Sequence, residues 1–143
     1  MTSNIKWEQI IELNERVKVR IAPSKIHGVG LFAMRDLKEG EKLYLDHVPK
    51  VYNLRHGDFG KLDKTVRELL LERWPQILNG SNFAYPDGRY AAYCNHSDAP
   101  NADTVHDVAL RDIQAGEELT EDYKLIPNSE KVFHWLDKKK VLT

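Results

Sequence analysis

The chain has little cysteine and no excess of either charge. Cys94 is the only cysteine among 143 residues, which excludes an internal disulfide and a cysteine-rich zinc cluster. The 21 lysines and arginines nearly balance the 22 aspartates and glutamates, so no overall positive field attracts nucleic acid or an anionic membrane. We therefore expect a macromolecular partner to be recognised locally, without direct binding to nucleic acid or membrane.

Long hydrophobic runs are also missing. No apolar stretch approaches the roughly 18 residues that a membrane-spanning helix needs, and residues 1–6 carry no charged-then-apolar leader. These absences predict a soluble intracellular protein without an export signal, in either cytoplasm or nucleus. The length fits one domain with a real hydrophobic core, either as a monomer or as a homodimer.

The first 15 residues favour a helix. Side chains recur there with the helical period of 3.6 residues, at Trp7, Ile10, Ile11 and Asn14. We expect this face of the helix to dock on the rest of the domain.

Residues 16–22 alternate strictly between basic and apolar side chains. This alternation is typical of a half-buried strand, in which residues such as Val19 face the core and residues such as Lys18 face solvent. Further short strands are predicted at residues 30–34 and 42–47, where turn residues separate the apolar stretches.

One nine-residue pattern occurs twice. Residues 35–43, RDLKEGEKL, and residues 111–119, RDIQAGEEL, share an Arg-Asp pair, a Gly-Glu pair and a final leucine at equal spacing. The repeat predicts one turn geometry used twice, with Gly40 and Gly116 at positive φ between two strands. A common charged surface turn is the alternative interpretation.

Two more helices are predicted further along the chain. Asp63 is a suitable cap for a helix at residues 63–74, which carries an apolar stripe and stops before Pro75. Residues 126–143 predict a terminal helix, with Trp135 on its apolar face and lysines at its negative end.

Three short motifs carry the chemical information. Residues 93–102 read YCNHSDAPNA, and residues 116–123 read GEELTEDY. A third piece, SKIHGVGLFA, lies near the N-terminus at residues 24–33. Each motif is weak alone, but the three in this order resemble the signature of the SET-domain protein lysine methyltransferases.

The resemblance covers about Val17 to Tyr123 and implies a fold. SET domains are mostly β and of the β-clip type, with several small sheets, a C-terminal segment threaded through a loop like a pseudoknot, and short flanking helices. The implied organisation is an N-terminal flanking helix at 1–15, the SET domain at 16–125 with an inserted helix at 63–74, and a closing helix at 126–143.

The resemblance also implies an activity, the transfer of a methyl group from S-adenosylmethionine to a lysine ε-amine of a histone-like or other protein. Only the uncharged amine attacks, and free lysine has a pKa of about 10.4, so the site must favour the neutral form through an apolar channel and the nearby sulfonium. Tyr123 corresponds to the catalytic tyrosine that orients the amine and the methyl group. The alternative for Tyr123 is a sheet tyrosine with a partly exposed hydroxyl.

Cofactor-binding positions follow from the same motifs. By resemblance, the Asn95 amide grips the amino-acid end of S-adenosylmethionine, the His96 backbone meets the adenine edge, and a glycine turn approaches the cofactor closely. A terminal aromatic residue stacks on the adenine and closes the lysine channel, where many relatives use a zinc-bound segment. The implied cofactor-binding set, which includes no metal, is Lys25, Gly28, Val29, Gly30, Asn95, His96, Phe133 and Trp135.

The substrate channel is expected to be lined by Tyr85, Tyr93 and Glu121. Glu121 departs from the family, which usually has an aromatic residue two positions before the final tyrosine, so the number of methyl groups transferred cannot be carried over. Residues two apart in a strand face the same side, which predicts that Glu121 lies beside Tyr123 and holds the lysine ammonium in its charged form. The other departures are Ala92 in place of an arginine, and residues 45–47 in place of a Glu-Tyr-x-Gly-Glu stretch.

Two other classes of function remain as alternatives. The first is a catalytically silent SET fold that binds a partner or S-adenosylmethionine without turnover, which Glu121 favours. The second is hydrolysis that uses Cys94 with a nearby histidine, or a bound metal. The metal ligands in that case would be His96, Asp98, His106 and Asp107, although their spacing matches no zinc motif.

Overall fold

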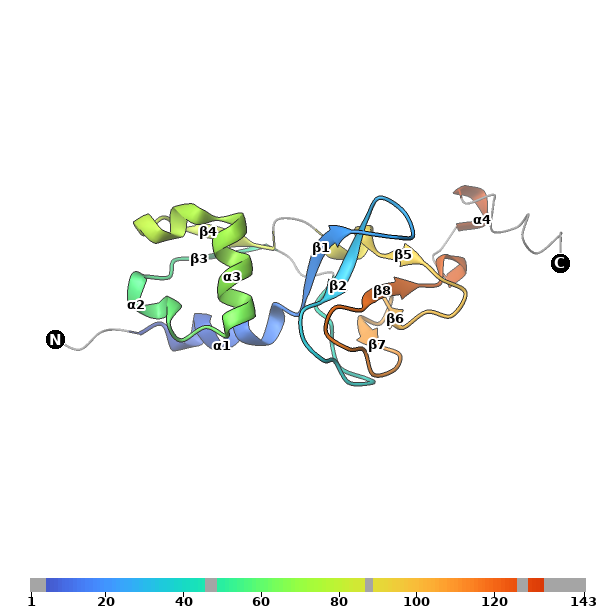
Figure 1. Cartoon of the computed structure of the whole chain (residues 1–143), viewed down its shortest axis with the longest axis horizontal. Helices are drawn as coiled ribbons and strands as arrows, with labels where there is room; N and C mark the ends of the chain where they lie inside the picture. The colour runs from blue at the N-terminus through green and yellow to red at the C-terminus, as the bar shows by residue number, and fades with distance from the viewer. Residues whose placement is uncertain (1–4, 46–48, 87–88, 126–128, 133–143) are drawn as a thin grey trace.

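The computed structural model describes residues 5–45, 49–86, 89–125 and 129–132. Along its longest axis the molecule has a helical half near the N-terminus and a strand-rich half that contains the C-terminal motifs (Figure 1). The helical half consists of α1 (Trp7–Arg16), β3 (Lys50–Tyr52), α2 (His56–Phe59), α3 (Lys64–Arg73), the 3₁₀ helix η1 (Pro75–Asn79) and β4 (Phe83–Tyr85).

The N-terminal helix α1 is present, but its buried face differs from the predicted one. Ile10 and Leu13 are buried, whereas Trp7 and Ile11 are 51% and 62% exposed. Both sets of positions fit a helical period, and Leu13 decides the outcome because it extends the apolar face towards the buried Val17. The predicted face was therefore right at Ile10 and wrong at Trp7 and Ile11.

The inserted helix α3 carries the predicted apolar stripe, since Val66, Leu69 and Leu70 are all buried. Asp63 occupies the N-cap position, but its side chain makes no capping hydrogen bond. The chain leaves the helix after Arg73, ahead of a proline that cannot continue it. The helix packs next to an aromatic cluster formed by Tyr52, Trp74, Phe83, Tyr85 and Tyr90.

The strand-rich half contains a four-stranded sheet in the order β1-β2-β8-β5. Strand β8 (Glu118–Glu121) pairs antiparallel with β2 (Val29–Ala33) and parallel with β5 (Asn95–His96). β1 (Val19–Pro23) forms the other edge and pairs antiparallel with β2. The last strand among the described residues thus lies between two earlier strands.

Asn101 fixes the threaded strand in place. Its side chain donates to the Glu118 carbonyl oxygen at 2.8 Å and accepts from the Thr120 backbone N–H at 2.8 Å. Asn101 is 2% exposed, so both ends of its amide are satisfied inside the protein. Just beyond Asn101, β6 (Ala102–Asp103) and β7 (Val108–Ala109) pair in a two-stranded sheet. A second two-stranded sheet is formed by β3 and β4 in the helical half.

The repeated nine-residue turns pack against each other. Leu37 and Ile113 exchange backbone hydrogen bonds of 2.7 and 2.8 Å. Asp36 accepts from the backbone N–H of Ala115, and Asp112 accepts from that of Glu39, each at 2.9 Å. The glycines at 40 and 116 both have positive φ, of 83° and 88°. One turn geometry is therefore used twice, and each turn supplies an aspartate to the other.

Two strand predictions need correction. Lys18 was expected to face solvent but is 5% exposed, because its Nζ lies 2.6 Å from a Glu41 carboxylate oxygen and 2.6 Å from the Lys42 carbonyl oxygen. No strand forms in the described part of residues 42–47, where Lys42 makes only an isolated bridge to Val108. Tyr44 has a φ of 59°, which is incompatible with an extended strand.

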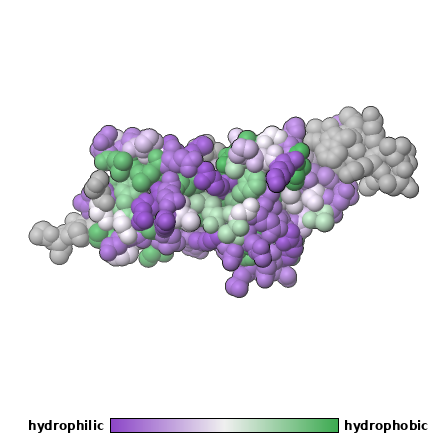
Figure 2. Space-filling model, in the orientation of Figure 1, coloured by the Kyte–Doolittle hydropathy of each residue, from purple (hydrophilic) through white to green (hydrophobic). Residues whose placement is uncertain are grey.

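The surface is mixed in character. Figure 2 shows hydrophilic atoms over most of the visible face, with the hydrophobic ones gathered mainly over the helical half. Among the described residues, no helix combines the length and apolar character required to cross a membrane.

Candidate functional site

The parallel pairing of β5 with β8 brings the two C-terminal motifs together. Asn95 lies opposite Thr120 and His96 lies opposite Glu121 in this register. The chain then leaves the sheet and enters the 3₁₀ helix η3 (Tyr123–Leu125). Tyr123 therefore stands at the point where backbone pairing within the sheet ends.

Tyr123 is held at both its backbone and its side chain. Its hydroxyl donates to the Cys94 carbonyl oxygen at 2.8 Å, and its backbone N–H donates to Nδ1 of His96 at 3.0 Å. Burial raises the pKa of the Tyr123 hydroxyl, with further contributions from the nearby Glu121 and Cys94. The phenol thus stays protonated and uses its one hydrogen on a protein carbonyl.

Asn95 connects the second motif to the first. The side chain is 6% exposed, and its Nδ2 lies 3.0 Å from the Val29 carbonyl, 3.1 Å from the His27 carbonyl, 3.1 Å from Ser24 Oγ and 2.9 Å from Glu118 Oε2. Because all four neighbouring groups can accept a hydrogen bond, the amide atom that faces them is assigned as nitrogen and the other as oxygen. The nitrogen thus holds the loop that joins β1 to β2, and only Oδ1 remains for a ligand.

Gly30 has a packing role that the sequence did not reveal. A Cβ atom at this position would lie 2.3 Å from Glu118 Oε2 and 3.1 Å from Asn95 Nδ2. The sequence suggested that Gly30 lets the backbone approach a ligand. In the structure, the Glu118 carboxylate and the Asn95 amide occupy the space that a side chain at position 30 would fill. Gly28 is different, since it has a φ of 48° and open space around it, as a tight turn requires. Lys25 is exposed on the same loop, and Val29 is exposed at the first position of β2.

Glu121 is buried, with only 6% exposure, and accepts a hydrogen bond from the Thr104 hydroxyl. Burial raises the pKa of the Glu121 carboxyl, and the negative charge of Asp103 adds to this effect. A small pocket opens beside it, lined also by Val105 and Leu125. The strand ends at Glu121, two residues before Tyr123, so the alternation that predicted a shared face does not extend to Tyr123. The two residues are nonetheless close enough for Glu121 to raise the pKa of Tyr123.

The remaining predicted residues lie in different surroundings. Tyr85 is 3% exposed and packs edge-on against Tyr90, with ring centroids 6.1 Å apart. Tyr93 is 43% exposed, in the 3₁₀ helix η2 (Tyr90–Tyr93). Their expected role in a substrate channel stays a prediction. Phe133 and Trp135 lie outside the described residues, which end with α4 (Ser129–Val132).

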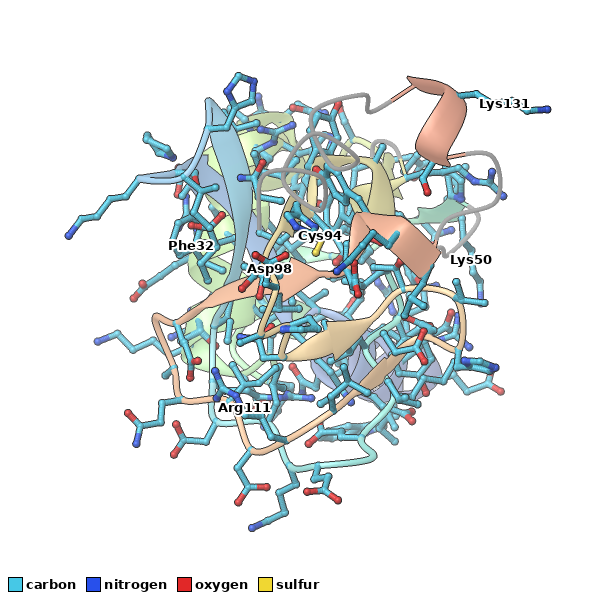
Figure 3. All side chains as sticks on the ribbon, turned by 90° about the vertical axis from the view of Figure 1, so that its right-hand side faces the viewer. Phe32, Lys50, Cys94, Asp98, Arg111 and Lys131 are labelled. Atoms are coloured by element: carbon cyan, nitrogen blue, oxygen red, sulfur yellow. The ribbon has the colours of Figure 1, made fainter. Side chains whose placement is uncertain are left out.

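Cys94 is unsuited to nucleophilic catalysis. It is 1% exposed, and its Sγ lies 3.4 Å from the Leu119 carbonyl oxygen. In Figure 3 the sulfur lies near the middle of the view. Burial raises the pKa of the thiol strongly, with additional effects of Glu121 and Glu118, so the reactive thiolate is suppressed.

The side chains considered as metal ligands are engaged separately. His96 contacts Asp98, whereas His106 contacts Asp103, and Asp107 accepts from the backbone of Tyr44. Among the described residues, no three His, Cys, Asp or Glu side chains stand where they could hold one ion.

Three residues of the site were missed at the level of the sequence. Ser24 and Glu118 complete the network around Asn95, with Ser24 Oγ lying 2.8 Å from Glu118 Oε2. Both residues lie within the three motifs, so their membership of a motif was the feature of the sequence that could have indicated them. Thr104, the partner of Glu121, lies outside every motif, and no pattern in the sequence indicated it.

The fold agrees with the family assignment of the chain. The sequence model of the SET domain matches residues 28–124, which is more than half of the chain. The chain therefore belongs to the SET domain family, and the mostly β fold of small sheets with short helices is the fold of that family.

One curated relative and two solved structures show the range of similarity. The histone-lysine N-methyltransferase, H3 lysine-4 specific, of Schizosaccharomyces pombe is 28% identical over 127 residues, covering 80% of this chain and 14% of the relative. The chain thus spans about one seventh of that protein. A candidate histone methyltransferase of Plasmodium falciparum is 19% identical, with a TM-score of 0.38, covering 74% of this chain and 92% of that chain. Chaetomium thermophilum Polycomb Repressive Complex 2 bound to GSK126 is 21% identical, with a TM-score of 0.39, covering 82% of this chain and 17% of that chain.

Proposed function

We propose that this chain is an S-adenosylmethionine-dependent protein-lysine N-methyltransferase. The observation that carries the proposal is the position of Tyr123, held by the Cys94 carbonyl and by His96 directly beside Asn95. The first motif contacts the other two at Asn95 and Glu118, and the second and third motifs meet at Tyr123. Membership of the SET family supports the same reaction class.

Tyr123 would orient the substrate amine rather than deprotonate it. Because its hydrogen is donated to Cys94 O, the hydroxyl oxygen offers only lone pairs to an incoming amine N–H. The raised pKa of the phenol keeps it protonated near neutral pH. The Cys94 carbonyl oxygen lies at the same point and supplies a second acceptor.

The residues around Asn95 suit the cofactor. Asn95 Oδ1 accepts no hydrogen bond from the described residues and is the acceptor that fits a charged amino group. When bound, S-adenosylmethionine would supply an electrophilic methyl group on a positive sulfonium. The loop at residues 24–29 would form the neighbouring wall, since Asn95 Nδ2 fixes its carbonyl groups. A closing role is proposed for the segment of residues 126–143.

Glu121 supports a second candidate, a SET module that binds ligands without turnover. A buried carboxylate near Tyr123 attracts a lysine ammonium and stabilises its charged, unreactive form. Turnover then requires that this attraction be overcome by the apolar walls and by the positive cofactor. The two candidates differ in methyl transfer and agree in cofactor binding.

The substrate class follows from the reaction: a protein or peptide that presents a lysine. Histone H3 is the first substrate to test, because the curated relative is named as specific for H3 lysine-4. The near-zero net charge of the chain supports recognition through local contacts rather than through nucleic acid.

Isothermal titration calorimetry with S-adenosylmethionine tests the binding step. We expect one site per chain in the wild type, and a loss of about 1–3 kcal/mol in Asn95→Ala because buried polar contacts are removed. The exposed Asn82→Ala serves as the matched control. Absence of binding by the wild type would overturn the proposal, whereas binding without methylation of histone H3 or of co-expressed proteins would select the silent module.

A further inference from the structure

The His96 side chain lies between Tyr123 and an acidic residue. Its Nδ1 is 3.0 Å from the Tyr123 backbone nitrogen, and its Nε2 is 3.0 Å from Asp98 Oδ1. A backbone N–H can only donate, so Nδ1 must present a lone pair. The ring hydrogen therefore sits on Nε2 and points to Asp98. Only this neutral tautomer satisfies both contacts.

The hydrogen bond from the Tyr123 backbone N–H to Nδ1 of His96 takes the place of a hydrogen bond to a neighbouring strand. Strand β8 ends at Glu121, so the Tyr123 N–H lies beyond the ladder of the sheet. The imidazole is 9% exposed, and its centroid is 5.2 Å from the centroid of the Tyr123 ring. The ring thus fixes the backbone of Tyr123 and also packs against its side chain.

We infer that His96 is a positioning residue that aims Tyr123 through this backbone hydrogen bond, and that methyl transfer is lost when the imidazole is protonated. The inference rests on the proposed function. It assigns the side chain of His96 a role separate from any contact of its backbone with the cofactor.

Protonation changes the bonding at Nδ1. The imidazolium donates from both nitrogens, so an N–H group would face the Tyr123 N–H and the hydrogen bond would break. Asp122 Oδ1 lies 4.0 Å from Nδ1 and would take the new hydrogen. Asp98 attracts the charge from the other side, while Lys124, whose Nζ is 4.0 Å from Asp98 Oδ1, opposes it. Tyr123 would then lose the hydrogen bond that holds its backbone N–H.

Two substitutions distinguish the role of His96 as a hydrogen-bond acceptor from the effect of its protonation. His96→Asn keeps an oxygen acceptor near the position of Nδ1 but does not titrate, whereas His96→Ala removes the acceptor. We expect kcat to fall about tenfold in His96→Ala, which corresponds to about 1.4 kcal/mol, with a smaller change in the Kd for S-adenosylmethionine. His96→Asn should recover most of that loss. Its rate should also fall less steeply towards low pH than that of the wild type, because only the substrate amine then has to lose a proton.

The matched control is His106→Asn. His106 also contacts an aspartate, Asp103, but its side chain is 76% exposed. Its pH profile should coincide with that of the wild type. An acid limb as steep in His96→Asn as in the wild type would overturn the inference, as would a His96→Ala enzyme with unchanged kcat.

Amide hydrogen exchange keeps the inference separate from the proposed function. In the cofactor-free protein, the Tyr123 amide should be protected in the wild type and in His96→Asn, and should exchange about tenfold faster in His96→Ala. This holds even if no substrate is ever methylated, in which case the proposed function fails alone. Equal exchange in all three proteins would show that His96 does not hold Tyr123.

Discussion

Replacement of Gly30 by alanine should displace the Glu118 carboxylate. The added Cβ would lie 2.3 Å from Glu118 Oε2, well inside van der Waals contact. Glu118 ends a flexible side chain, so it can move away, and the cost arises from the hydrogen bonds that it leaves. These bonds come from Ser24 Oγ at 2.8 Å and from Asn95 Nδ2 at 2.9 Å.

The size of the effect follows from those two bonds. A hydrogen bond to a charged group contributes about 1.5–3 kcal/mol, and partial exposure of Glu118 reduces this through solvent screening. We therefore expect Gly30→Ala to lower the free energy of unfolding by about 1–3 kcal/mol. Because the same displacement frees the Asn95 amide to rotate, affinity for S-adenosylmethionine should fall as well.

Urea unfolding of a double-mutant cycle is the appropriate assay. In a Glu118→Ala background the carboxylate is absent and only the 3.1 Å approach to Asn95 Nδ2 remains, so Gly30→Ala should cost clearly less than it does with Glu118 present. Gly57→Ala is the control, since a Cβ at Gly57 meets nothing within 4 Å. Equal costs of Gly30→Ala in both backgrounds would refute the packing argument.

The remaining predictions concern Glu121 and the C-terminus. Glu121→Phe should change the distribution of mono-, di- and trimethyl products and move the onset of activity to lower pH, because a carboxylate that stabilises the lysine ammonium is removed; identical mass-spectrometric products and pH profiles would show that Glu121 does not face the substrate. The pKa of Glu121 is higher in the folded than in the unfolded protein, so ionisation of this carboxyl destabilises the fold once the pH rises above the pKa of the unfolded state. Urea titrations should therefore show that Glu121→Gln raises the free energy of unfolding more at pH 7 than at pH 4. Truncation before Pro127 should leave a folded domain, judged by circular dichroism, with weak cofactor binding by calorimetry, and tight binding by that protein would exclude a closing role for the Trp135 segment.

The motifs predicted the parts of the site that lie within one element or in adjacent strands. Asn95, His96 and Tyr123 belong to two short stretches, and the β5–β8 pairing places them together as the resemblance implied. The equal spacing in the two repeated turns likewise predicted the positive φ at both glycines. Such features depend on local spacing, which a sequence displays directly.

Contacts between distant residues were beyond the reach of the sequence. Ser24 and Glu118 are 94 positions apart, and nothing local shows that they share hydrogen bonds or that Gly30 must leave room for them. The burial of Lys18 depends in the same way on Glu41 from another segment. Glu121 was placed by strand alternation, but the strand ended before Tyr123, and alternation holds only while the strand continues.

The most direct test compares methyl transfer by the wild type and by Tyr123→Phe, with cofactor binding measured on the same samples. Mass spectrometry of histone H3 incubated with S-adenosylmethionine reports the transfer, and Tyr44→Phe, whose hydroxyl contacts Glu15, is the control. The account predicts that Tyr123→Phe binds the cofactor like the wild type and loses at least about tenfold in rate, the equivalent of about one hydrogen bond to the reacting amine. Turnover by Tyr123→Phe at the wild-type rate would contradict the account.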